Sequence, residues 1–397
     1  MDLLDRRVAE SEEGHPFKLS VERIVLTQFR SYAHLVLEVG PGPIVLIGGN
    51  GAGKTNLLEA LSLLAPGRGL RGARMMDIRR RSAGERVWGV SVELSTAGGS
   101  VQIGTGTSSK SEGTREVRVQ GTRSSGQDGL ARELHAIWLT PQMDRIFIDP
   151  PGERRRFFDR LVGGFDPGHG ARLTAYQRTL AERGRILRYR PDDSGWLDAL
   201  ERTMSESAVA ISAARHEALW RLNSALASPL GTLFPPAKME LVGVGEDWLR
   251  DMPALEVEEL LLSAFAAARA EDAERGGSAV GPHRTDLSVS HVAKDIPAEH
   301  CSTGEQKMLL ISIILAHAHA QSKLFGQTPL ILLDEVMAHL DQAHRGALTE
   351  ALCSLGSQVW MTGTSDELFS QFGSRAQFLC VSGGVVRNLR MRDPIYD

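Results

Sequence analysis

The chain of 397 residues contains no long hydrophobic run. Its longest unbroken apolar stretch, Met308 to Ala316, has nine residues and includes a serine, whereas a helix needs about 20 apolar residues to span a bilayer. The first twenty residues mix charges with single apolar residues and contain no small-residue cleavage site. The sequence therefore predicts no membrane span and no secretory signal, and we expect residues 1–17 to form a flexible leader.

Cysteine is also scarce. The three cysteines, Cys301, Cys353 and Cys380, lie far apart in the sequence. An odd number of distant thiols is typical neither of a disulfide framework nor of a Cys/His metal site. A reducing cytoplasm is the expected compartment.

Lysine is scarce among the basic residues, since seven of the 45 are lysine and the other 38 are arginine. Genome base composition is the simpler explanation of this bias, although arginine also binds phosphate through a forked guanidinium group. The formal net charge of −4 gives no sign of an overall basic surface. Any contact with nucleic acid is therefore expected from local clusters of arginine.

The hydrophobic residues, 42% of the chain, suffice for the core of one large domain or two ordinary ones. Gly/Ser-rich turns separate β-rich runs in the first part of the chain, and residues 104–129 are expected to form an exposed hairpin and loop. The expected strands are 21–29, 35–39, 43–49, 87–94, 100–105, 116–120 and 135–139.

The composition changes at about residue 152, where Arg, Ala, Leu and Glu become dominant. This stretch predicts a helical insert as far as residue 275, broken once at 191–195. No repeat or sustained heptad occurs, so we expect a compact lobe rather than a coiled-coil arm. The mixed pattern then returns, with a helix expected at 303–321 and strands at 330–333 and 358–362.

A glycine-rich octapeptide follows the third β-rich run and precedes a helical pattern. Glycines in such a P-loop let successive backbone N–H groups form a concave anion site at a helix N-terminus. Lys54 would contact the β- and γ-phosphates of ATP, and the Thr55 hydroxyl would ligate Mg²⁺. A glycine-rich turn beside an exposed lysine is the alternative, and it leaves the full match to the pattern unexplained. The expected ATP-binding residues are Gly48, Gly49, Asn50, Gly51, Ala52, Gly53, Lys54 and Thr55.

The apolar run Leu330–Leu333 ends in two acidic residues. A buried parallel strand of this kind delivers carboxylates to its C-terminal edge. We expect Asp334 to hold Mg²⁺ through water and Glu335 to orient or deprotonate the attacking water. Apolar runs that end in Asp-Glu also precede ordinary helices, so the P-loop earlier in the chain is what favours the catalytic interpretation.

A cluster of small residues, Cys301 to Gly304, directly precedes an apolar helix. A hydroxyl and exposed amides at a helix start form a second anion site, although a plain helix cap is the simpler interpretation of the cluster alone. The order of the motifs favours the anion site, because a strand ending in Asp-Glu and the segment Leu340-Asp341 follow. The expected nucleotide contacts here are Ser302, Gly304 and Gln306.

Together these motifs resemble the head of an ABC-type ATPase, with a Walker A loop at 48–55, a signature at 302–306, Walker B at 330–335 and a D-loop at Asp341. The resemblance implies an α/β P-loop head with a mixed sheet. It also implies a half-site, in which the signature of one copy closes on ATP held by Lys54 of another. Where transporter heads carry a switch histidine, this chain has Thr362 and Thr364.

The insert of intermediate length resembles that of the RecF family of recombinational-repair ATPases. Four segments carry the resemblance: residues 26–32, 48–59, 152–159 and the tetrapeptide Gly281–Arg284. It covers about residues 20–390 and implies a head at 18–150 and 280–397 around a mainly helical lobe at 151–279. Thr285 and Glu305 depart from the family pattern, and Gln142 is the nearest candidate for a glutamine-loop residue.

The same resemblance implies an ATP-dependent homodimer, duplex DNA at gaps or junctions, and RecR as a partner. The protein would load a recombinase and maintain replication forks, with slow ATP hydrolysis that dimerisation and DNA stimulate. Phosphate contacts without base readout would hold the DNA. The arginine clusters at 68–74, 79–81 and 154–156 are candidates, although charge runs are more often only solvated surface. The expected DNA contacts are Arg68, Arg71, Arg79, Arg80 and Arg81.

Two alternatives stay open at this point. A transport ATPase subunit would need a membrane partner, and it should have neither the long helical insert nor a threonine switch. A nucleotide-gated clamp would bind ATP with negligible turnover, which the position of Glu335 disfavours.

Overall fold

The computed structural model describes residues 19–80, 87–108, 111–124, 128–228 and 234–389. The expected leader, residues 1–17, and Arg81 lie outside these ranges. Two compact units divide the chain. The first unit comprises residues 1–140 and 321–397, and the second unit comprises residues 141–320. The expected lobe, 151–279, lies inside the second unit, which extends further at both ends.

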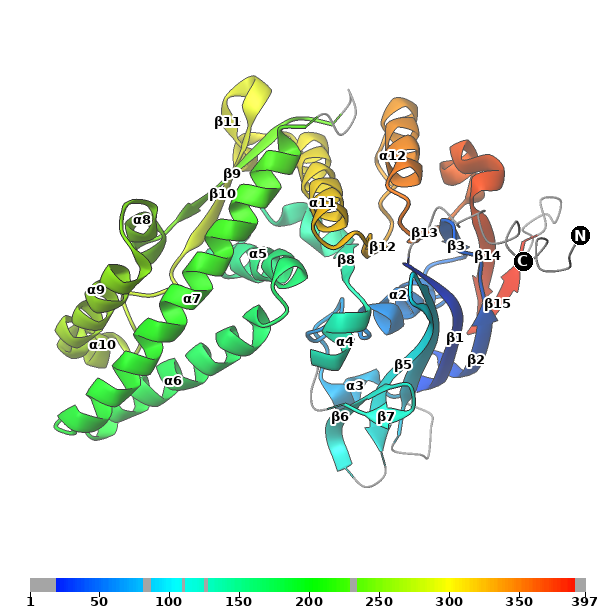
Figure 1. Cartoon of the computed structure of the whole chain (residues 1–397). Helices are drawn as coiled ribbons and strands as arrows, with labels where there is room; N and C mark the ends of the chain where they lie inside the picture. Colours follow the sequence, from blue (N-terminus) through cyan, green and yellow to red (C-terminus); the bar gives the residue numbers. More distant parts are fainter. Residues whose placement is uncertain (1–18, 81–86, 109–110, 125–127, 229–233, 390–397) are drawn as a thin grey trace, which may run out of the picture. The chain divides into compact units, whose positions relative to one another are not determined.

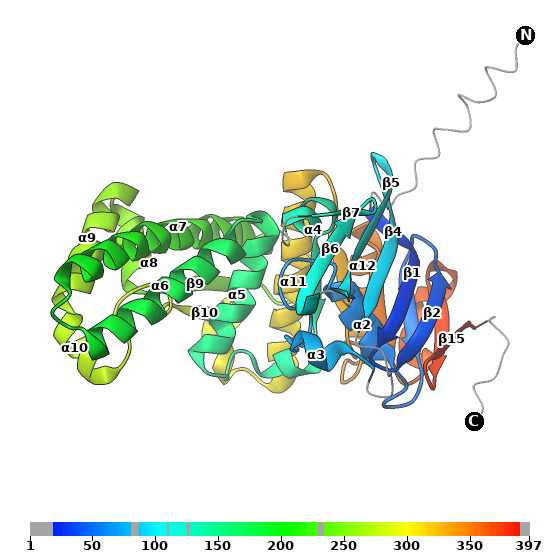
Figure 2. The ribbon, with the colours of Figure 1, turned by 90° about the horizontal axis from the view of Figure 1, so that it is seen from below.

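Within the described residues, the first unit contains two six-stranded sheets. One is antiparallel, with its strands side by side in Figure 2, in the order β2 (Tyr32–Glu38), β1 (Leu19–Phe29), β4 (Gly89–Thr96), β5 (Gly99–Ser108), β6 (Ser111–Val119) and β7 (Thr122–Arg123). The other is mixed, in the order β15 (Val385–Asn388), β14 (Gln377–Ser382), β3 (Ile44–Ile47), β13 (Val359–Gly363), β12 (Leu330–Leu333) and β8 (Ala136–Leu139). The helices of the first unit include α2 (Lys54–Ser62), α3 (Met75–Ile78), α4 (Asp128–Glu133), α12 (Gln342–Ser354) and the 3-10 segment η4 (Asp366–Arg375).

The two sheets differ in sequence pattern for a physical reason. β3, β12 and β13 are buried along their whole length, and β3 and β12 are entirely apolar, because parallel strands are covered on both faces. Strand β1 alternates, with Ile24 and Leu26 buried. The buried Gln358 joins the sheets, since its amide accepts from the Val21 N–H at 2.9 Å and donates to the Gly40 carbonyl at 2.8 Å.

Strands β5 and β6 continue into residues that we expected to form an exposed hairpin and loop. Thr105 and Val117 are buried there, and they pair directly across the two strands. The expected hairpin is therefore present, but it is not exposed along its whole length. Glycine-rich composition concealed its burial, because Gly104 and Gly106 lie in β5 without contributing a side chain to an alternating pattern.

The second unit is mainly helical, as expected (Figure 1). Its helices are α5 (Pro151–Phe165), α6 (His169–Tyr189), α7 (Ser194–Leu226), α8 (Val244–Asp251), α9 (Ala254–Ala267), α10 (Arg269–Arg275) and the start of α11 (Thr303–Phe325), with 3-10 turns η1 (Pro141–Arg145), η2 (Val292–Lys294) and η3 (Ala298–His300). Besides the expected break at 191–195, helices end at Phe165, Leu226 and Asp251.

A small antiparallel sheet in the second unit was missed. It has the order β11 (Ile296–Pro297), β10 (Asp286–His291) and β9 (Ala237–Val242). Strand β9 lies within the stretch expected to be helical, and its six residues alternate between buried and exposed. So short an alternation is hidden when composition is averaged over a long helical stretch.

Among the described residues, α11 alone is long and apolar enough to cross a membrane by length and composition. However, 72% of its apolar window is buried inside the protein. This burial is typical of a core helix.

Candidate nucleotide site

The P-loop begins directly after the buried strand β3 and includes Lys54 and Thr55, the first two residues of α2. Gly53 has φ 115°, a left-handed conformation that favours glycine, and a Cβ there would lie 2.9 Å from the Tyr32 hydroxyl. A Cβ on Gly48 would lie 2.2 Å from the Val381 carbonyl oxygen. Glycine is therefore required at both positions to bring the loop against its neighbours.

The side chains of Lys54 and Thr55 turn toward polar groups of the first unit. Lys54 Nζ donates to the carbonyl oxygens of Gly48 at 2.6 Å and Gly49 at 2.9 Å. Burial lowers the pKa of Lys54, and the charges of Glu335 and Asp334 act in the opposite direction. The Thr55 hydroxyl lies 3.0 Å from Asp334 Oδ1. The residues expected to bind phosphate and magnesium thus lie together.

The Walker B segment consists of strand β12 and the two acidic residues that follow it. The Asp334 carboxylate, 8% exposed, follows β12 and also accepts a hydrogen bond from the Thr362 hydroxyl at 2.7 Å. Glu335 has φ 50°, which costs a non-glycine residue roughly 1–2 kcal/mol. Its backbone N–H donates to Thr362 Oγ1 at 2.9 Å. A carboxylate on unusual backbone at a sheet edge is typical of a functional position.

The two threonines expected at the switch differ in environment. Thr362 is fully buried, and its hydroxyl is bonded to Walker B. Thr364 is exposed. The D-loop Asp341 caps α12 by accepting from the His344 N–H at 2.8 Å. That hydrogen bond lowers the pKa of Asp341.

The signature lies in the second unit, at the start of α11. Ser302 and Glu305 form a capping box, because the Ser302 N–H and hydroxyl donate to Glu305 Oε2 at 2.9 and 3.0 Å. Lys294 forms an ion pair with Glu305 and, with Ser302, lowers the pKa of Glu305 to about 2. Gly304 is exposed. Gln306 is buried, and its amide donates to the Cys301 carbonyl at 2.9 Å, so it fixes the loop from inside.

The P-loop helix carries a buried carboxylate that the sequence did not single out as a charge partner. Glu59 is 1% exposed, and both of its oxygens accept from Arg30, at 2.9 and 2.6 Å. Arg71 donates to the same carboxylate at 2.7 Å and to the Asn56 amide oxygen at 2.8 Å. Arg71, expected to contact DNA, therefore holds the P-loop helix in this structure.

The other arginine candidates vary in exposure. Arg68 and Arg74 are exposed, whereas Arg79 and Arg80 are half-buried. The Arg80 N–H donates to the Gln28 carbonyl at 2.9 Å, which anchors the segment to β1.

The cluster at 154–156 is largely occupied by contacts within the second unit. Arg154 forms a two-bond ion pair with Asp286, at 2.8 and 2.7 Å. Arg155 donates to the Thr285 carbonyl at 2.8 Å, and Arg156 pairs with Glu153. These bonds assign the cluster a structural role at the start of α5.

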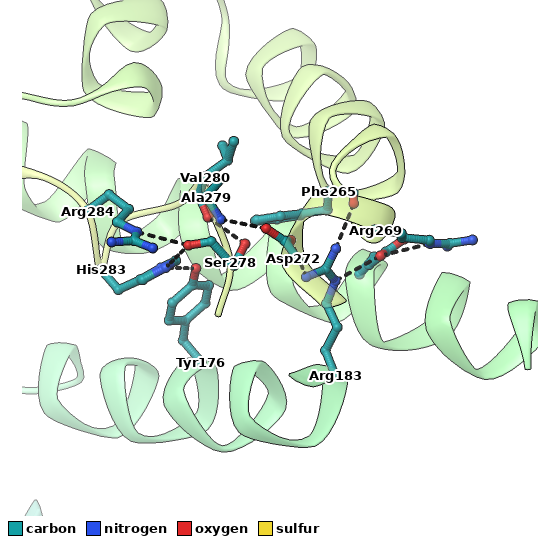
Figure 3. A network of polar contacts seen from close by, with 11 residues as sticks. Tyr176, Arg183, Phe265, Arg269, Asp272, Ser278, Ala279, Val280, His283 and Arg284 are labelled. Atoms are coloured by element: carbon teal, nitrogen blue, oxygen red, sulfur yellow. Dashed lines mark hydrogen bonds and ion pairs between the residues drawn. The ribbon is translucent and has the colours of Figure 1, made fainter. Parts of the chain in front are cut away.

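The tetrapeptide Gly281–Arg284 is also anchored in the second unit (Figure 3). His283 Nε2 lies 3.0 Å from the Ser278 carbonyl oxygen and its Nδ1 lies 2.9 Å from the Tyr176 hydroxyl. Burial lowers the pKa of His283. Arg284 Nε donates to the same carbonyl at 2.8 Å, and its side chain is exposed.

An ABC-type P-loop ATPase head is defined by four features present in this chain: the mixed sheet, the P-loop, the paired Walker B acids and the helical insert. Residues 20–385 match the family described as the RecF/RecN/SMC N terminal domain. The DNA replication and repair protein RecF of Mesorhizobium japonicum is 45% identical over 374 residues, which cover 94% of this chain and 98% of that protein. RecF of Rhizobium meliloti is 45% identical over 94% of this chain and 99% of that protein. This chain belongs to the RecF family.

Solved structures agree on the fold. The recombination mediator protein RecF-ATPrS in the RecFOR pathway has a TM-score of 0.82 at 22% identity and covers 94% of this chain and 99% of that chain. An Smc head bound to the C-winged helix domain of ScpA has a TM-score of 0.54 at 16% identity, with 94% of this chain and 98% of that chain covered. The fold is therefore that of RecF and SMC heads, and it is membership of the RecF family that disfavours the transport-subunit alternative.

Proposed function

We propose that this chain is a DNA-binding ATPase of recombinational repair. One observation carries the proposal: Thr55, Asp334 and Thr362 form a continuous hydrogen-bonded line beside Lys54 and Glu335. This line brings the groups expected to bind phosphate, to hold Mg²⁺ and to activate water into one unit. Membership of a family whose relatives are DNA replication and repair proteins supports the same conclusion.

ATP and Mg²⁺ fit the residues present. The Thr55 hydroxyl and the Asp334 carboxylate are hard oxygen ligands placed side by side, as Mg²⁺ requires. Bound Mg²⁺ would neutralise charge on the phosphates. Lys54 would leave the Gly48 and Gly49 carbonyls to bind the β- and γ-phosphates, with the P-loop amides of Gly48, Gly49, Asn50, Gly51, Ala52 and Gly53 around them. The Glu335 carboxylate would hold the attacking water and accept its proton.

We propose further that hydrolysis takes place at a site shared by two copies. Ser302 and Gly304 of one copy would meet ATP held by Lys54 of the other, with Asp341 near the contact. Gln306 would act by shaping the loop. On closing, the Ser302 hydroxyl must exchange the Glu305 carboxylate for phosphate. A solitary copy is expected to be a slow ATPase, because its bound ATP meets no Ser302.

DNA would bind through phosphates and regulate this dimer. Exposed Arg68 and half-buried Arg79 and Arg80 are the contacts we favour, and Arg81 is kept as a candidate beside them. Duplex DNA at gaps or junctions is the proposed substrate, RecR the proposed partner and the cytoplasm the proposed compartment. The DNA-bound dimer would load a recombinase during DNA damage and at stalled replication forks.

The experiment is the ATPase rate per protomer as a function of protein concentration, with and without gapped duplex DNA. We expect the rate to rise with concentration and to rise further with DNA. Lys54→Ala, purified identically, controls for contaminating ATPases. A rate per protomer that changes with neither protein concentration nor DNA would contradict the shared site. A rate equal to that of Lys54→Ala would contradict the proposal that the protein is an ATPase.

A further inference from the structure

Thr362 occupies a position that the expected switch role does not explain. Strand β13 pairs in parallel with β12, and Leu333 lies opposite Met361. Because the strands run in parallel, the residues that follow this pair, Asp334 and Thr362, are also neighbours. Thr362 is fully buried.

The Thr362 hydroxyl makes two bonds at once. It donates to Asp334 Oδ1 at 2.7 Å and accepts from the Glu335 N–H at 2.9 Å. A hydroxyl has one proton to donate. Because that proton is used on Asp334, Thr362 in this arrangement has none to offer a phosphate oxygen, and direct sensing of nucleotide falls to another group.

Glu335 depends on this contact more than an ordinary residue would. Its φ of 50° lies in the left-handed region, which an L-residue keeps only when its surroundings impose it. Two bonds fix its backbone: its N–H to Thr362, and its carbonyl accepting from the Ala338 N–H at 3.2 Å. Without the first bond, the backbone can relax and carry the Glu335 carboxylate away from the water.

We propose that Thr362 is a positioning residue for ATP hydrolysis. Its hydroxyl sets the carboxylate that holds Mg²⁺ and the carboxylate that activates water at a fixed separation, and it touches neither ATP nor water. This inference rests on the proposed function of Asp334 and Glu335. A threonine that merely packs a buried strand would need its shape and not its hydroxyl, so the two roles are separable.

Two substitutions separate hydroxyl from shape. Thr362→Val keeps the β-branched shape and removes the hydroxyl, whereas Thr362→Ser keeps the hydroxyl. Thr328→Val is the matched control, because Thr328 is a buried threonine just before β12, at the end of the strand opposite Asp334, and its hydroxyl donates to the Gly356 carbonyl at 3.2 Å.

Steady-state ATPase assays at saturating DNA would give kcat, KM for ATP and the Mg²⁺ concentration for half-maximal rate, and a fluorescent ATP analogue would report binding. For Thr362→Val we expect kcat to fall about tenfold or more, the Mg²⁺ requirement to rise, and nucleotide affinity to stay within about threefold. Thr362→Ser and Thr328→Val should stay within about threefold of the parent in kcat. In a Glu335→Gln background, Thr362→Val should slow the residual rate far less, because the base is already lost.

Three results would overturn the proposal: an unchanged kcat in Thr362→Val, equal losses in the Val and Ser variants, or a loss confined to nucleotide affinity. If Thr362→Val fails to fold, a comparison of Thr362→Ala with Thr362→Ser decides. Both variants lose the γ-methyl group and only the Ala variant loses the hydroxyl, so the proposal predicts a raised Mg²⁺ requirement in the Ala variant alone, and equal behaviour of the two variants would overturn it. Failure of the proposed function itself would look different, because the parent protein would then hydrolyse no more ATP than Lys54→Ala.

Discussion

The buried side chain of Arg183, on α6, forms hydrogen bonds to three other helices of the second unit, α7, α9 and α10 (Figure 3). Its guanidinium, 1% exposed, donates to Glu201 at 2.8 Å, to Asp272 at 2.6 Å and to the Phe265 carbonyl at 2.7 Å. Arg183→Met keeps most of the apolar stem and removes the charge. Both carboxylates would then be buried without their main partner.

The expected loss follows from that burial. Removing one partner from a buried ion pair costs about 3–5 kcal/mol, because the desolvated charge that is left has no compensation. Arg269 also donates to Glu201, at 3.0 Å, and the Ala279 N–H donates to Asp272 at 2.8 Å. These contacts retain part of the compensation, so we expect a value near the lower end, about 3 kcal/mol.

Urea unfolding, with hydrogen exchange in α6, α7 and α10 to follow the second unit by itself, would measure the loss. Arg221→Ala is the control, since Arg221 forms an ion pair with Glu217 on the surface of α7 and such pairs contribute about 0–1 kcal/mol. An Arg183→Met protein within about 1 kcal/mol of the parent would refute the reasoning and indicate that water enters the network.

Three further predictions concern the nucleotide, DNA and pH. Lys54→Ala should lower the ATPase rate at least about a hundredfold, because a preorganised charge is removed from the transferring phosphate, and near-normal activity in a contaminant-free sample would contradict the site. Reversing Arg79 and Arg80 to Glu should weaken duplex binding and reduce the salt slope by about 0.9 for each lost contact, while strong discrimination among duplex sequences would contradict phosphate binding. Burial lowers the pKa of His283, so on acidification the unfolded chain binds a proton at this side chain before the folded protein does. The stability that neutral His283 contributes is therefore present above about pH 6.5 and is lost as the pH falls through the lowered pKa. Hydrogen exchange of residues 278–284, corrected for intrinsic rates, should therefore rise on acidification from neutral pH, and His283→Gln should remove this rise.

The sequence predicted the parts of the site that are local in the chain. The P-loop and the strand Leu330–Leu333 lie where expected, since glycine spacing and a buried apolar run are visible within a few residues. The helix at Thr303 was also predicted from its capping residues. The roles of the site residues stay predictions until variants are assayed.

Other features depend on contacts that no local pattern reports. The two hydrogen bonds of the Thr362 hydroxyl depend on the register between β12 and β13. The ion pair of Arg71 with Glu59 depends on the path that the chain takes after α2. Strand β9 was missed because its partner strand lies far along the chain. A long-range contact of this kind becomes predictable only when the topology is known.

The central claim, a site shared by two copies, is tested most directly by sedimentation of Glu335→Gln with ATP and Mg²⁺. The substitution keeps the shape of the side chain and leaves Asp334 intact, but it slows the chemical step. The account predicts that an ATP-bound dimer accumulates, and that Ser302→Arg added to the same background restores a monomer that still binds ATP. A Glu335→Gln protein that stays monomeric at every concentration, or a Ser302→Arg protein that dimerises normally, would contradict the account.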